Sequence, residues 1–371
     1  MVATDSGSMG RRIAQARGSA GLTQEELAKA VGIDRSALAK IENGTRRVSA
    51  LELARIANTV GERIEWFVIE APPAVVSHRN LSAPGTASPL IDRILERAAW
   101  NTEFILSHDD RLDLTSPATQ PKPHTLNDAE EAAALARRTL GFDTTEPAFN
   151  LSSRFSDAGL LPFALDLGPD AADAAVMHLR QGGVAVVNGH LQVGRRRLAA
   201  VHELGHYLFA EDYSVDWQIG ERDDDDMWEA RVDRFARAFL LPSAGIQHHW
   251  NLLRPQHDLR TAAVKAASRF RVDMSTLARR LFELCLVSQG TAQQIRQFRT
   301  TRADIVELNL LVHDELAAPH LARAYEEAVV RLYRQETISI SRATDLLFGT
   351  WNEDDFPGLP NLPESAVRNL V

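Results

Sequence analysis

The stretch Arg195–Tyr207, RRRLAAVHELGHY, determines how the middle of this 371-residue chain folds. It contains the pattern H-E-x-x-H, in which His202 and His206 are four residues apart and Glu203 lies between them. Residues four apart lie on the same face of a helix, so both imidazoles can reach one metal ion. Glu203 is offset from that face and can touch a metal-bound water. The stretch therefore predicts a helix that carries a metal site.

Apolar residues surround this motif and predict that its helix is buried. They are Leu198, Ala199, Ala200, Val201, Leu204, Leu208 and Phe209. Burying two histidines and a glutamate is costly unless each has a polar partner. A metal ion would be such a partner. The alternative is a helix whose two histidines are hydrogen-bonded in the core without a metal.

A catalytic zinc site usually has three protein ligands and leaves a fourth position for water. The downstream stretch MWEARVDRFARAFLLP, residues 227–242, has a helical period that places Glu229 and Asp233 on one face. We predict that Glu229 is the third ligand. We expect Asp233 to accept the free N–H of a ligating histidine and so fix its tautomer. The alternative is a solvated acidic face, which the apolar residues of this helix disfavour.

HELGHY followed by E-x-x-x-[DN]-x-F-A-x-x-[FL]-L-[LM]-P resembles the ImmA/IrrE-type zinc metallopeptidases, many of which cut or antagonise a DNA-binding repressor. The resemblance implies that His202, His206 and Glu229 bind zinc and that Glu203 is the general base. Arg231 stands where many members of the family carry an acidic residue. The third ligand therefore remains open between Glu229 and a neighbouring acidic residue.

Composition restricts the class of protein. The content of 44% hydrophobic and 25% charged residues is that of a folded soluble protein. No apolar run approaches ~20 residues, so we expect no membrane span, and the amino terminus shows no signal peptide pattern. The single cysteine, Cys285, excludes an intramolecular disulfide and favours the cytoplasm.

Residues 9–68 predict a compact helical domain. Thr23 and Glu26 form a capping box at the start of a helix, and Gly32 ends that helix. A second helix is expected over residues 35–41, after a three-residue turn. Two helices joined in this way form a helix-turn-helix, whose second helix enters the major groove of DNA.

The sequence LTQEELAKAVGIDRSALAKIENG, residues 22–44, resembles the Xre/Cro-like helix-turn-helix family. The residues that this resemblance places on DNA are Arg35, Ser36 and Lys40 at base edges, and Gln24 and Asn43 at phosphates. It also implies a structural ion pair between Arg17 and Glu42. Residues 1–68 hold 10 Lys and Arg against 8 Asp and Glu, whereas the whole chain carries a net charge of −9. Only this domain is electrostatically suited to DNA. An alternative is that the helix-turn-helix contacts another protein and not DNA.

Short β-like runs precede the metal motif at residues 160–165, 174–179 and 184–187. They predict a small sheet packed against the metal helix. Extended peptides often bind such a sheet by adding a strand to its edge, and Ala174–Leu179 is the expected edge strand. The acidic stretch Glu211–Asp226, between the two predicted metal helices, is expected to be an exposed loop.

The expected organisation is multidomain and mainly α. An all-α helix-turn-helix domain, 9–68, precedes a linker and helical connector, 69–125. An α+β zincin-like metallopeptidase domain with a small sheet covers 126–290. A helical region with an extended tail is expected over residues 291–371. Arg279 and Arg280, before it, are expected to pack against the peptidase core, and contact with DNA is the alternative.

These features predict a DNA-binding regulator fused to a zinc endopeptidase. The expected cofactor is Zn²⁺, and the expected partners are double-stranded DNA and a protein substrate such as a repressor or toxin-like protein. A homodimer is left open. Tyr207 and His190 are candidate oxyanion stabilisers. The alternative is a repressor or antitoxin-like regulator whose zinc fold is structural or sensory and does not turn over.

Overall fold

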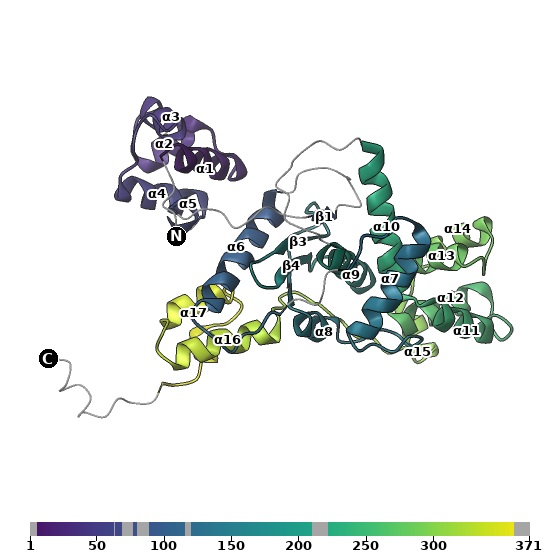
Figure 1. The fold of residues 1–371 in the computed structure, drawn as a ribbon. Coiled ribbons are helices and arrows are strands. Elements are labelled where there is room, and N and C mark those ends of the chain that lie inside the picture. The colour runs from purple at the N-terminus through teal and green to yellow at the C-terminus, as the bar shows by residue number, and fades with distance from the viewer. Residues whose placement is uncertain are drawn as a thin grey trace. The chain divides into compact units, whose positions relative to one another are not determined.

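The computed structural model describes residues 6–62, 64–68, 77–79, 89–115, 120–209 and 222–359. Within these ranges the chain is mainly helical. It divides into two compact units, residues 1–74 and residues 75–371. The first unit is all helical, whereas the second surrounds a small sheet with helices (Figure 1).

The described helices of the first unit are α1 (Ser6–Ser19), α2 (Gln24–Val31), α3 (Arg35–Glu42), α4 (Ala50–Val60) and α5 (Ile64–Val68). They enclose an apolar core that includes Leu27, Leu38 and Ile56. The predicted capping box is present, because Thr23 and Glu26 bond to each other's backbone N–H groups. Gly32 ends α2 with a left-handed φ of 78°, a conformation that glycine adopts at little cost. The helix-turn-helix prediction is confirmed.

The sheet of the second unit is mixed, with strand order β1-β3-β4-β2 in the described residues. The bounds are β1 (Ser77–Arg79), β2 (Leu160–Leu165), β3 (Ala174–His178) and β4 (Gly183–Asn188). β2 runs parallel to β4, whereas β3 is antiparallel to both β4 and β1. The prediction that β3 is an edge strand is wrong for this chain, because three residues from the connector pair with its outer side.

Successive side chains along each strand point to opposite faces of the sheet, so the two faces contribute to two different apolar cores. Leu160, Val176 and Val187 face a core shared with α9 (Val193–Phe209). The residues that alternate with these, among them Leu161, Ala175 and Val186, face a second core. This core is shared with α6 (Pro89–Leu106), α16 (Arg323–Arg334) and α17 (Ile340–Leu346). α6 and α16 contact each other although they are far apart in the sequence (Figure 1). Helices therefore bury both faces of the sheet, and α9 lies on one of them.

Two arginines anchor the start of α9, and one of them is buried. Arg195 pairs with Asp173 at 2.8 Å. Arg197 is fully buried, pairs with Glu315 and donates to the Ala148 carbonyl at 2.6 Å. Burial lowers the pKa of Arg197 to about 9. These bonds connect α9 to distant segments and fix the helix that carries the metal motif.

The second metal helix, α10 (Arg222–Leu240), packs against α9 and against α7 (Leu126–Thr139) (Figure 1). α10 begins at Arg222, so the expected loop is wrong over residues 222–226. Acidic residues are favourable in the first turns of a helix, and a charge run therefore does not define where a loop ends. Residues 211–221 of the expected loop lie outside the described residues.

The remaining helices surround these elements. They are α8 (Leu151–Asp157), α11 (Ser243–Leu253), α12 (Leu259–Phe270), α13 (Met274–Glu283), α14 (Gln289–Gln297), α15 (Arg302–Glu307) and the 3₁₀ turn η1 (Glu353–Asp355). In the part of the chain that is described, no helix combines the length and apolar character needed to cross a membrane.

Candidate metal centre

Three side chains from α9 and α10 converge on one point. His202 Nε2 lies 3.1 Å from His206 Nε2 and 3.1 Å from Glu229 Oε2. His206 Nε2 lies 3.4 Å from Glu229 Oε1. Ligands bound to a tetrahedral zinc at 2.0–2.1 Å are separated from one another by about 3.3 Å. The spacing of these two nitrogens and one carboxylate therefore fits Zn²⁺, which prefers such donors.

The centre is buried on the side of α9. His202 and His206 are 1% and 5% exposed, and Glu203 is fully buried. The Glu229 side chain is 47% exposed, so the centre faces solvent on the side of α10. Burial alone would raise the pKa of Glu229. Hydrogen bonds and attraction from His202 and His206 outweigh it and hold that pKa well below its ordinary range.

Gly205 allows the two metal helices to approach closely. A Cβ atom at this position would lie 3.0 Å from both Phe235 and Val232 on α10. With a larger residue, the Phe235 and Val232 side chains would have to shift by a few tenths of an ångström, because such contacts are tighter than most in a packed core. Phe235 also packs edge-on against Phe209, with 5.1 Å between ring centroids. The absence of a side chain at Gly205 thus helps to keep Glu229 within reach of the histidines.

Asp233 orients one of the two histidines. Its Oδ1 lies 3.0 Å from His202 Nδ1, while the opposite nitrogen of that ring faces Glu229. A proton on Nδ1 donated to Asp233 leaves the Nε2 lone pair for a metal. This is the arrangement that the sequence predicted for Asp233.

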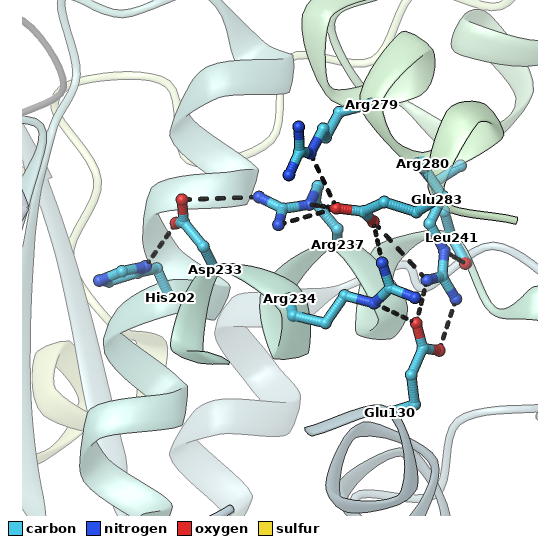
Figure 2. A network of polar contacts seen from close by, with 9 residues as sticks. All are labelled: Glu130, His202, Asp233, Arg234, Arg237, Leu241, Arg279, Arg280 and Glu283. Atoms are coloured by element: carbon cyan, nitrogen blue, oxygen red, sulfur yellow. Dashed lines mark hydrogen bonds and ion pairs between the residues drawn. The ribbon is translucent and has the colours of Figure 1, made fainter. Parts of the chain in front are cut away.

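Asp233 is itself held by an ion-pair network (Figure 2). Arg237 lies 3.5 Å from Asp233 and 3.0 Å from Glu283 at the end of α13. Glu283 also pairs with Arg234 at 2.9 Å and with Arg279 at 3.0 Å. The network connects the orientation of His202 to a helix outside the metal centre.

A second carboxylate, Glu130 on α7, extends this network (Figure 2). It pairs with Arg234 at 2.5 Å and with the fully buried Arg280. Arg280 also donates to the Leu241 carbonyl at 2.8 Å. The prediction that Arg280 packs against the core is therefore confirmed, whereas Arg279 is half exposed. The sequence did not indicate Glu130 and Glu283 as members of this network, because nothing in their local pattern distinguishes them from surface acids.

We expect Asp233→Ala to lower zinc affinity or activity by about 10–100-fold, since only the orientation of His202 is lost. Asp157→Ala, at an exposed position on α8, is the matched control and should change neither zinc affinity nor activity. Zinc affinity is measured by competition with a chromogenic chelator. An unchanged affinity and activity in Asp233→Ala would remove this residue from the site.

Tyr207, His190 and Arg231 are not among the three side chains that converge. Tyr207 donates to the Ala158 carbonyl at 3.1 Å and stacks on His178, with 5.0 Å between centroids. His190 lies half exposed, 3.2 Å from Asp166. Arg231 donates to the Pro123 carbonyl at 3.4 Å. Glu229, and not position 231, belongs to the acidic and histidine group described above.

The five predicted DNA-contact residues lie on α2, α3 and the turn after α3. Arg35, Ser36, Lys40 and Asn43 are exposed. The Gln24 amide is half-buried and donates to Glu42 at 2.7 Å. Glu42 also pairs with Arg17 at 2.7 Å, so the structural ion pair is confirmed. The exposed side chains of α3 are thus accessible to the major groove of DNA.

Comparison with known proteins gives two family matches. A family model described as helix-turn-helix matches residues 13–67. A peptidase-family model described as IrrE N-terminal-like domain matches residues 157–282. The second match contains β2 to β4 and both metal helices. Among curated proteins, none matches the chain.

One solved structure with a similar sequence is the restriction-modification controller protein C.AhdI from Aeromonas hydrophila. It is 31% identical, and the match covers 16% of this chain and 92% of that protein, with a TM-score of 0.16. The two family models identify residues 13–67 as a helix-turn-helix domain and residues 157–282 as an IrrE N-terminal-like domain, the domain of ImmA/IrrE-type metallopeptidases.

Proposed function

We propose that the protein is a DNA-binding transcriptional regulator whose second unit is a zinc-dependent endopeptidase. Its substrate would be a protein such as a repressor or a toxin-like protein. Its first unit would bind double-stranded DNA.

The observation that carries the peptidase proposal is the convergence of His202, His206 and Glu229 at distances that suit zinc. Glu203 follows His202 on the same buried helix. A structural zinc site is normally closed by four protein ligands, whereas a catalytic site has three and keeps one position for water. Three side chains form the group found among the described residues, and the intact Glu203 beside them supports catalysis.

Each residue has a distinct part in the reaction. His202, His206 and Glu229 would hold Zn²⁺, which lowers the pKa of a water ligand towards about 7 and polarises the scissile carbonyl. Glu203 accepts the proton of the attacking water and passes it to the leaving amine. Asp233 keeps His202 in the tautomer that presents Nε2.

A direct test of the function is incubation of the zinc-loaded protein with a repressor-like or toxin-like protein encoded beside it. We expect a discrete cut that Glu203→Gln abolishes. DNA binding and full zinc content without hydrolysis of any protein would favour the alternative, a regulator whose zinc fold is structural or sensory.

The DNA-binding proposal is supported by the family match and by the exposed residues of α3. Arg35, Ser36 and Lys40 carry groups that hydrogen-bond to base edges in the major groove. Gln24 begins α2 and Asn43 follows the last residue of α3, and amide side chains of this kind hydrogen-bond to phosphates.

We expect Lys40→Ala to relax base preference at one position of the operator by roughly 1–3 kcal/mol. Gln24→Ala should instead weaken binding to all sequences alike, because phosphate contacts carry no base information. Since Gln24 also bonds to Glu42, the melting temperature of that variant is checked first. Binding of the full chain to a randomised DNA pool is measured at several salt concentrations. No salt-dependent binding to any DNA would contradict the proposal.

A further inference from the structure

The strand β1 comes from the segment that connects the helix-turn-helix unit to α6. It lies antiparallel to β3, with Ser77 opposite Val176 and Arg79 opposite Ala174. β3 lies far along the chain from this segment. The protein has therefore added a short piece of its own connector to its sheet, in the manner of a bound peptide.

The edge that β1 occupies lies beside the metal centre. Both β1 and β3 contact α9, the helix that carries the metal motif. At the end of β3, His178 stacks on Tyr207, the residue after His206. Because β1 runs in the opposite direction to β3, Ser77 is its residue nearest to His178. The amino-terminal end of β1 thus points towards the end of β3 that adjoins the metal motif.

The matched peptidase domain, residues 157–282, contains the other three strands but not β1. Without β1, β3 would be an open edge in the described sheet. An extended peptide binds such an edge through main-chain hydrogen bonds. β1 therefore takes the position that an extended substrate would take beside the metal helix.

We propose that the chain is a substrate of its own metal site and is hydrolysed, within one molecule, inside β1. This inference rests on the proposed peptidase function. A water oxygen bonds to the carbonyl carbon, the C–N bond breaks, and Glu203 transfers the water's proton to the leaving amine. One water is consumed, and the products are two fragments with a new carboxylate and a new amine.

Covalent connection favours this reaction over cleavage of a separate protein. A tethered segment is held near its site at a high effective concentration, so it competes well with substrates in solution. The cut would separate the first unit, residues 1–74, from the unit that carries the metal centre. DNA binding would then lose its connection to the peptidase in a single step.

The test follows the full-length chain after loading with zinc. Intact mass spectrometry should detect a fragment that begins at His78 or Arg79 and that is absent in Glu203→Gln. The first-order rate constant should not depend on protein concentration, because site and substrate share one molecule. A rate constant that rises with concentration would overturn cleavage within one molecule.

A strand variant tests the pairing itself. Alternate N–H groups of an antiparallel strand point to its neighbour, so His78→Pro with Arg79→Pro removes at least one ladder donor. Self-cleavage should slow by about tenfold or more, as expected for a lost ladder bond. The control, Leu311→Pro with Val312→Pro, places two prolines in an exposed segment outside the helices and strands and should have no effect.

Hydrogen exchange gives a readout that needs neither metal nor turnover. In a Glu203→Gln background, which keeps the chain intact, the two proline substitutions in β1 should speed exchange of backbone amides over residues 174–176 of β3. Unchanged exchange would overturn the inference, because β1 would then not protect β3 in solution.

Digestion of an added unfolded protein, such as casein, separates the remaining outcomes. If the wild type digests casein but is never cut near Ser77, the inference is wrong and the peptidase function stands. If the proline variant digests casein faster while no chain is cut, β1 is a blocking strand and not a substrate. Full zinc content with no hydrolysis of either protein would contradict the proposed function as well.

Discussion

Replacing Glu203 by glutamine is expected to lower hydrolysis by about 10²–10⁴-fold while zinc content stays at the wild-type level. The substitution keeps the size of the side chain and removes its negative charge and its ability to accept a proton. The residues that hold the metal are untouched, because Glu203 is not one of the three converging ligands. Activity and zinc content are measured on the same preparation.

Glu307→Gln is the matched control, since Glu307 is an exposed carboxylate on α15. This variant should change neither the rate of hydrolysis nor the zinc content. Hydrolysis that survives Glu203→Gln undiminished would show that another group activates the water. Zinc lost together with activity would show that Glu203 holds the metal or the fold of α9.

The second large effect is expected for His202→Ala combined with His206→Ala. Removing two of three ligands leaves Glu229 alone, and one carboxylate does not retain zinc against the buffer. The double variant should therefore bind essentially no zinc and show no hydrolysis. Because a bound metal stabilises the folded state, added zinc should raise the melting temperature of the wild type but not of the variant.

The matched control is His248→Ala with His313→Ala, two exposed histidines outside the metal centre. This variant should bind as much zinc as the wild type and melt at the same temperature. Stoichiometric zinc in His202→Ala with His206→Ala would contradict the metal assignment entirely.

Much of this architecture follows from local patterns in the sequence. The spacing of His202 and His206 predicted the first metal helix, which runs from Val193 to Phe209. Short β-like runs between turns predicted β2, β3 and β4 to within one residue at each end. Such features depend on residues close together in the chain, where helical or extended geometry fixes which side chains share a face.

Features that depend on contacts between distant segments were missed. Glu283 and Glu130 hold the arginines around Asp233 from other helices, and no local pattern indicates such a partner. The pairing of β1 with β3 joins residues about 100 positions apart. This pairing contradicted the prediction that β3 is an edge strand. Which strands pair beyond a hairpin is set by tertiary packing, which the local sequence does not show.

The measurement that tests the account most directly is the zinc content of Glu229→Ala beside the wild type, after dialysis, by inductively coupled plasma mass spectrometry. The geometry of α9 and α10 predicts about one zinc per wild-type chain and almost none in the variant, since two histidines alone hold the ion weakly. Full zinc occupancy in Glu229→Ala would show that the third ligand lies elsewhere and would remove α10 from the metal centre.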